Sequence, residues 1–144
     1  MGEWIETYRG AVLASEYDPE SHMNTQLYTA RFDQATWFLL SSVGITPDSM
    51  KKSNRRVAVM RQNLEFKQEL KGGQLVIIKS GVMSVGDKYL RFVHRMLDGV
   101  SGDMLATDDC TAVEADLKTG KSRKLPPEVR KAAEGHVVTR RFED

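Results

Sequence analysis

The chain has 144 residues, enough for one domain with a hydrophobic core and too few for two ordinary domains. Lysine and arginine number 21 and aspartate and glutamate 20, so the formal net charge of +1 favours neither nucleic acid nor a membrane surface. The sequence begins without a signal-peptide pattern and contains no run of roughly 18 apolar residues, the length that spans a bilayer. One cysteine excludes an internal disulfide, and three scattered histidines speak against a metal site. We therefore expect a soluble, cytoplasmic protein that holds no metal.

Residues 8–16 are rich in small and apolar side chains, which predicts a strand. One long helix should follow it, beginning after Asn24 or Thr25, either of which can cap a helix, and ending at Gly44. Apolar residues lie nearly all round the axis of this helix, so we expect it to be buried. They leave only a narrow polar arc, made of Thr29, Asp33 and Thr36.

Period-two alternation and turn residues predict four further strands. They cover residues 56–66, 74–85, 88–97 and 104–117, and they should form an antiparallel meander. The polar segment ahead of them predicts a loop or a short helix, and a second short helix should open at the Pro126-Pro127 pair and reach Ala133. We expect a single domain over residues 1–135 and a mobile tail over 136–144. The predicted class is α+β, with a curved antiparallel sheet wrapped around one long buried helix.

Three stretches of the sequence carry a family resemblance. They are Asp18-Pro19-Glu20-Ser21-His22-Met23-Asn24 with Tyr28 and Phe32, residues 63–75, and Leu105-Ala106-Thr107. Together they resemble the hotdog fold and, within it, the 4-hydroxybenzoyl-CoA thioesterase-like family of acyl-CoA thioesterases. Two positions depart from the family pattern, since Ser21 replaces a usual glycine and Glu69 stands where proline is common. The helix continuation from Phe32 to Ile45 is further similar to thioesterases that act on betainyl-CoA.

The resemblance implies that Asp18 is the general base or the nucleophile of a thioester hydrolysis. A thiolate leaves readily, so a carboxylate suffices if the carbonyl is polarised. The N-terminus of the long helix can supply that polarisation through the backbone N–H groups of Met23 to Thr25. The residues alone leave a second interpretation open, because Asp-Pro is a common turn opener whose carboxylate bonds nearby amides.

Further site residues follow from the same resemblance. His22 and Asn24 are the other candidate catalytic residues, although a loop histidine is often solvated and an asparagine there can simply cap the helix. The candidate substrate-binding residues are Met23, Thr25, Tyr28 and Asn63, although an aromatic residue at helical spacing, such as Tyr28, more often belongs to the core. The phosphates of coenzyme A need basic partners, for which the candidates are Lys79, Lys88, Arg91 and Arg95. If the acyl group were betaine, its ammonium could lie on Tyr8, Trp37, Phe38 or Tyr89.

We therefore expect an acyl-CoA thioesterase that needs no cofactor, since coenzyme A belongs to the substrate. The resemblance implies a homodimer, or a tetramer built from two dimers, with active sites between subunits. No nucleic-acid or membrane partner is expected. Two alternatives stay open: a hotdog protein that binds acyl-CoA or acyl carrier protein without hydrolysis, and a hydratase or dehydratase of the same fold, although no histidine and acid pairing is evident.

Overall fold

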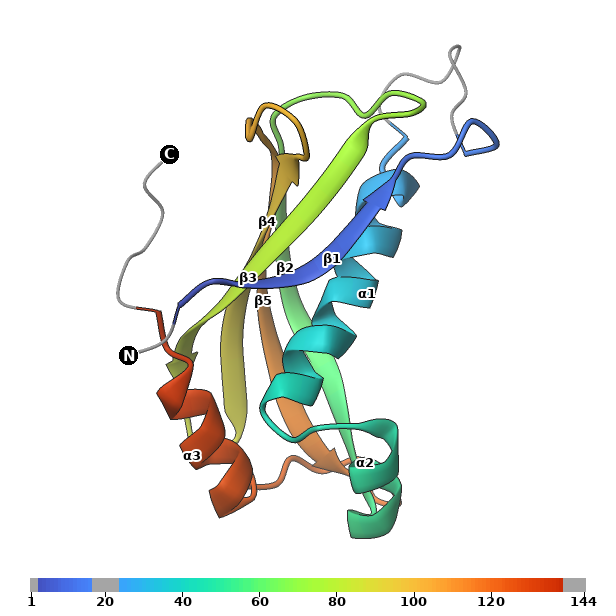
Figure 1. Ribbon diagram of the computed structural model, residues 1–144. Helices are drawn as coiled ribbons and strands as arrows, with labels where there is room; N and C mark the ends of the chain where they lie inside the picture. The colour runs from blue at the N-terminus through green and yellow to red at the C-terminus, as the bar shows by residue number, and fades with distance from the viewer. Residues whose placement is uncertain (1–2, 17–23, 139–144) are drawn as a thin grey trace.

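The structure is a computed structural model that describes residues 3–16 and 24–138 (Figure 1). Five strands form one antiparallel sheet in the order β1-β3-β4-β5-β2. A long helix, α1, lies across one face of this sheet, and two short helices lie near the C-terminal end of that helix. The strands are β1 (Ile5–Ala11), β2 (Arg55–Phe66), β3 (Leu75–Val85), β4 (Tyr89–Asp98) and β5 (Met104–Asp116), and the helices are α1 (Gln26–Ser42), α2 (Pro47–Ser53) and α3 (Pro127–Gly135).

The predicted four-stranded meander is wrong in one respect. β3, β4 and β5 pair in chain order, but β2 pairs with β5 and not with β3. The connection over residues 67–74 is too long for a tight hairpin, and the N–H groups of Lys67 and Gln68 both donate to Leu105 O of β5. β2 is therefore an edge strand, and no strand in the described ranges pairs with its other side.

The first strand begins and ends earlier than predicted. β1 pairs with β3 only as far as Ala11, which lies opposite Leu75 at the beginning of β3. Beyond that point Val12 exchanges backbone hydrogen bonds with Gly73 and Gln74 of the turn before β3, and the chain then turns so that Glu16 N–H donates to Leu13 O. The expected strand over residues 8–16 is therefore replaced by a strand end followed by a turn.

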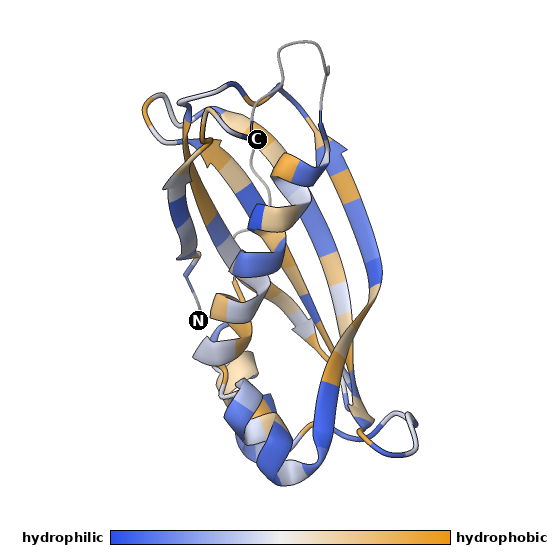
Figure 2. Cartoon of the chain, turned by 90° about the vertical axis from the view of Figure 1, so that its right-hand side faces the viewer, coloured by the Kyte–Doolittle hydropathy of each residue, from blue (hydrophilic) through white to orange (hydrophobic). Residues whose placement is uncertain are grey.

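α1 has the predicted extent, but it is buried on one side only. Its buried residues are Leu27, Tyr28, Arg31, Phe32, Ala35, Thr36, Leu39 and Leu40. Trp37 and Phe38 are 44% and 64% exposed, because a single sheet covers only one side of a helix. The outward side of α1 mixes hydrophilic and hydrophobic residues (Figure 2). The helix ends where expected, since Gly44 takes a left-handed conformation with φ of +89° just after it.

Two separate apolar clusters fill the space between α1 and the sheet. One surrounds the first half of α1 and includes Tyr28, Phe32, Ile78, Met96 and Leu105. The other surrounds the second half and includes Leu39, Leu40, Val82, Phe92 and Val129 of α3. The core of this domain is thus divided along the length of α1.

The chain beyond α3 returns to the sheet. Val137 forms a bridge with Val82, and the N–H of Val138 donates to Val82 O. Val138 is buried with Met83, Val93 and Trp4, and a side chain at Gly81 would collide with it, since its Cβ would lie 2.6 Å from Val138 Cγ1. The tail that we expected beyond Gly135 thus begins with packed residues, while 139–144 lie outside the described residues.

Removing the Tyr28 hydroxyl should destabilise the fold. This hydroxyl donates to Gln68 O at 2.7 Å and accepts from the buried N–H of Leu70 at 3.2 Å. Tyr28→Phe removes both bonds and leaves the buried N–H of Leu70 without a partner, so we expect a loss of about 1–3 kcal/mol in the free energy of unfolding, measured with urea. Tyr89→Phe, at a site that is 40% exposed, is the control and should lose less than about 0.5 kcal/mol. Equal losses in the two variants would contradict the structural role of Tyr28.

Candidate functional site

Three of the expected site residues, Asp18, His22 and Met23, lie outside the described residues. The chain on both sides of them is anchored to the first turns of α1. On one side, Glu16 Oε1 accepts from Nη2 of the buried Arg31 at 2.8 Å, and this bond helps hold the pKa of Glu16 below its ordinary value. On the other side, Asn24 Oδ1 accepts from Gln26 N–H at 3.0 Å.

The first N–H groups of α1 are already in use. The N–H of Gln26 is bound by the Asn24 side chain, and the next three N–H groups donate to the carbonyls of Asn24 and Thr25. Thr25 is the N-cap residue, is exposed, and makes no capping bond through its own side chain. An oxyanion at this end would therefore have to be bound by backbone N–H groups that precede Gln26.

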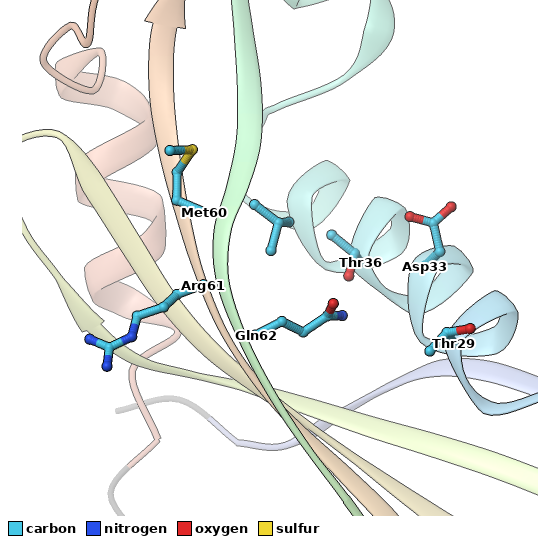
Figure 3. Close-up of a pocket in the computed structure, with 7 residues that line it drawn as sticks. Thr29, Asp33, Thr36, Met60, Arg61 and Gln62 are labelled. Carbon is cyan, nitrogen blue, oxygen red and sulfur yellow. The ribbon is translucent and has the colours of Figure 1, made fainter. Parts of the chain in front are cut away.

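A groove of about 370 Å³ lies between α1 and the edge strand β2 (Figure 3). The polar arc of α1 lines it with Thr29, Asp33 and Thr36. Gln62 points from β2 toward these residues, whereas Arg61 points away from α1. Val59 and Met60 complete the lining. Because Thr29 is one turn from the beginning of α1, the groove runs from near the helix N-terminus along the helix.

A chain of buried hydrogen bonds lies behind the groove and separates the two apolar clusters. His94, which is fully buried, bonds Thr36 Oγ1 through Nε2 at 2.8 Å and Ser80 Oγ through Nδ1. Ser80 Oγ in turn lies 2.7 Å from Thr7 Oγ1. The chain therefore crosses from α1 through β4 and β3 to β1.

The hydroxyl groups at the two ends of this chain, on Thr36 and Thr7, indicate which nitrogen of His94 carries the proton, because only one of them at a time can donate to a backbone carbonyl. Burial lowers the pKa of His94 from 6.5 to about 3, so the ring is neutral and has one N–H. If Nε2 carries it, Thr36 is free to donate to Phe32 O at 3.0 Å. If Nδ1 carries it, the chain ends instead in the longer bond from Thr7 to Ile78 O, at 3.4 Å. The shorter bond favours the Nε2–H tautomer.

Asp108 extends this row of polar side chains toward β2. It lies opposite His94 on β5, is fully buried, and accepts from Gln62 Nε2 at 2.8 Å through Oδ2. Burial raises its pKa, against the lowering effect of hydrogen bonds from Gln62 and Cys110. Its Oδ1 has no hydrogen-bond partner among the described residues. Burial also raises the pKa of the Cys110 thiol, which packs in the second apolar cluster.

The other face of the sheet brings two of the expected residues together. Asn63 and Arg91 line a hollow of about 590 Å³ with Arg61, Asp109 and Thr111. Arg91 binds Asp109 with two hydrogen bonds, at 3.0 and 2.6 Å, so its guanidinium is fixed in place. Asn63 therefore lies on the side of β2 away from the groove.

The remaining expected residues are more scattered. Lys79 and Arg95 are neighbours across β3 and β4, with Arg95 over the Trp4 ring at 5.1 Å, and Lys88 lies in the exposed turn before β4. The Tyr28 hydroxyl is bound by backbone groups, as described above.

None of the four aromatic candidates is among the residues that line the groove. Tyr8 is instead stacked under Arg31 at 5.8 Å. Gln62, His94 and Asp108 were not among the predicted site residues. The sequence does mark two of them, because Gln62 and His94 are polar residues at positions where the alternation along their strands otherwise places apolar side chains.

Two negative observations apply to the described ranges. No helix in them is both long and apolar enough to span a bilayer. No group of three or more histidine, cysteine, aspartate or glutamate side chains there is arranged to hold a metal ion.

A family model described as the thioesterase-like superfamily matches residues 12–133. The chain belongs to this superfamily. The predicted family and the hotdog fold are thereby confirmed, since one long helix lies on a curved antiparallel sheet and solved structures share this fold.

Two curated proteins resemble the chain in sequence. One is the L-carnitine dehydrogenase/betainyl-CoA thioesterase of Rhizobium meliloti, 29% identical over 130 residues, which are 88% of this chain and 26% of that protein. The chain thus spans about a quarter of that relative. The other is the betainyl-CoA thioesterase of Pseudomonas aeruginosa, 24% identical over 90% of this chain and 81% of that protein.

A solved structure resembles the chain in fold. It is a hypothetical protein from Staphylococcus aureus in complex with CoA, with a TM-score of 0.88 and 13% identity, covering 100% of this chain and 92% of that chain.

The neutral, buried His94 should make stability depend on pH. Below its ordinary pKa of 6.5 the unfolded chain binds a proton that the folded chain refuses until about pH 3. Stability is thus fully present above that ordinary pKa and falls by about 1.4 kcal/mol for each pH unit below it. Between about pH 7.5 and about pH 5 the parent should lose about 2 kcal/mol more than His94→Gln, measured by urea unfolding. Identical pH profiles for the two proteins would contradict a neutral His94.

Proposed function

We propose that this chain hydrolyses an acyl-CoA thioester to a free acid and coenzyme A, without a further cofactor. The observation that carries the proposal is the polar groove along α1, which begins one turn from the helix N-terminus in a member of the thioesterase-like superfamily. A groove beside a helix N-terminus offers a place for an acyl group next to a place for an oxyanion.

The proposed reaction takes place at the beginning of α1. The thioester carbonyl oxygen accepts hydrogen bonds from backbone N–H groups of Met23 to Thr25, and Asp18 acts as general base for water or as nucleophile. The carbon gains an oxygen, the carbon–sulfur bond breaks, and the sulfur leaves as a thiolate that takes a proton. His22 is proposed to give that proton, and Asn24, whose side chain accepts from Gln26 N–H, is proposed to hold the start of the helix for the reaction. The anchoring of Glu16 and Asn24 to α1 supports this arrangement.

The acyl group is proposed to enter the groove between α1 and β2. Thr36 and Gln62 line it and are each held from behind, by His94 and Asp108 respectively. Asp33 gives the groove a carboxylate, which suits an acyl group with a positive charge such as betaine. The names of the two curated relatives support the same substrate.

The length of the groove supports longer acyl groups as well. At a rise of about 1.5 Å per residue, Thr29 lies about 5 Å and Thr36 about 15 Å along the axis from Gln26. The ammonium of betaine is one carbon from the carbonyl, so a betainyl group bound at the helix N-terminus would reach only the level of Thr29. Asp33, one turn further along, would attract this ammonium across about 6 Å rather than contact it. A substrate panel must therefore include longer acyl chains.

Coenzyme A is proposed to place its phosphates on the other face of the sheet, near Arg61 and Arg91. The solved CoA complex of the same fold is consistent with a CoA site in such a chain.

A homodimer is supported by the open edge of β2, where Val59 and Met60 are 44% and 69% exposed. Pairing there would bring a second subunit next to the groove, and two such dimers could form the tetramer.

Thiol release from a panel of acyl-CoAs tests the proposal. The panel holds betainyl, short, branched, aromatic and longer aliphatic thioesters, and we expect at least one to be hydrolysed. Asp18→Asn should lower kcat/KM for it by about 100-fold or more, because the carboxylate takes part in the chemical step. Asp103→Asn, in the exposed turn after β4, is the matched control and should be unchanged.

Two results would contradict the proposal. An Asp18→Asn variant that is folded by circular dichroism and hydrolyses as fast as the parent removes Asp18 from the reaction. Tight binding of acyl-CoA without thiol release from any member of the panel would favour the non-hydrolytic alternative.

A further inference from the structure

A second cavity lies at the end of the molecule opposite the beginning of α1, where α1, α2 and α3 approach one another (Figure 1). Its volume is about 300 Å³, which is in the range of small-molecule sites. The buried side chains of Val43, Ile45 and Val129 and the half-buried Met50 give it an apolar wall. None of its lining residues lines the groove between α1 and β2.

One lining residue of this cavity is a buried carboxylate with an unused oxygen. The Glu114 side chain is 4% exposed, and its Oε1 accepts from Arg55 Nη1 at 2.9 Å. The Arg55 nitrogen also donates to Lys124 O, so the guanidinium is held from outside the cavity. Glu114 Oε2 is buried and has no hydrogen-bond partner among the described residues. A buried carboxylate oxygen without a donor is costly, which points to a ligand that supplies one.

The charges around the cavity favour a cation. Arg55 balances Glu114, and the positive end of α3 is balanced by Glu128 in its first turn, which also lines the cavity. Ser42, the last residue of α1, and Val43, its C-cap residue, add the negative end of a long helix. The sum of these contributions is negative, and no lysine or arginine lines the cavity.

We propose that this cavity binds a small primary ammonium ion with an apolar body. The ammonium donates to Glu114 Oε2, and the hydrocarbon part packs on Val43, Ile45 and Val129. The site is separate from the groove proposed for the acyl group, and the inference does not depend on thioester hydrolysis.

NMR titration of the ¹⁵N-labelled protein with three probes of similar shape tests the inference. Benzylammonium, benzyl alcohol and benzoate are each added at neutral pH. We expect saturable shifts for benzylammonium in the amides of residues 42–53 and 126–132, at least about tenfold weaker binding of benzyl alcohol, and no saturable binding of benzoate. Glu114→Gln should weaken benzylammonium binding by about tenfold or more.

Glu114→Gln also breaks the ion pair with Arg55, so a second variant guards against loss of folding. Ala132→Phe fills the cavity from α3 and leaves Glu114 and Arg55 in place, and it too should weaken benzylammonium by at least about tenfold. The inference is overturned if benzyl alcohol binds as tightly as benzylammonium, if the shifts lie in the groove between α1 and β2, or if the folded Ala132→Phe variant binds as the parent does. Absence of saturable binding by all three probes would mean that water alone fills the cavity, which also overturns it.

Discussion

The hydrogen-bonded chain through His94 is the contact on which the placement of α1 over the sheet depends. The apolar clusters on either side of it could tolerate some rotation of the helix, because apolar contacts are not directional. The bond from His94 to Thr36 is directional and buried, so losing it would leave His94 Nε2 without a partner, while Thr36 would keep only its bond to Phe32 O. Holding Thr36 against His94 also sets the direction of Thr29 and Asp33, which share its side of the helix and line the groove.

The row of buried polar side chains across the sheet is better explained by a role in shaping the groove than by a contribution to the stability of the fold. Replacing a buried polar pair with apolar residues of the same shape is often neutral or stabilising. Here the row reaches the groove at two residues, Thr36 of α1 and Gln62 of β2, which face each other across it. Asp108 holds Gln62 at the cost of leaving its own Oδ1 without a partner. The polar row therefore orders the wall of the proposed acyl site.

The sequence predicted the elements of the fold better than their assembly. Periodicity located α1 and four of the five strands, because local side-chain patterns determine them. It did not show that β2 pairs with β5, since strand order depends on contacts between distant residues. The polar arc of α1 was evident from the sequence, but Gln62 was not assigned to it, because the two face each other only when β2 is the edge strand of the sheet. The burial of Asp108 could not be predicted for a related reason, because it depends on which strands lie on either side of β5.

A crystal structure with a non-hydrolysable thioether analogue of a bound acyl-CoA tests the central claim most directly. The account predicts that the acyl chain lies between α1 and β2, in contact with Thr36 and Gln62, with the sulfur at the beginning of α1 and the phosphates near Arg61 and Arg91. An acyl chain in the cavity beside Glu114, or on the exposed side of α1 near Trp37 and Phe38, would contradict it.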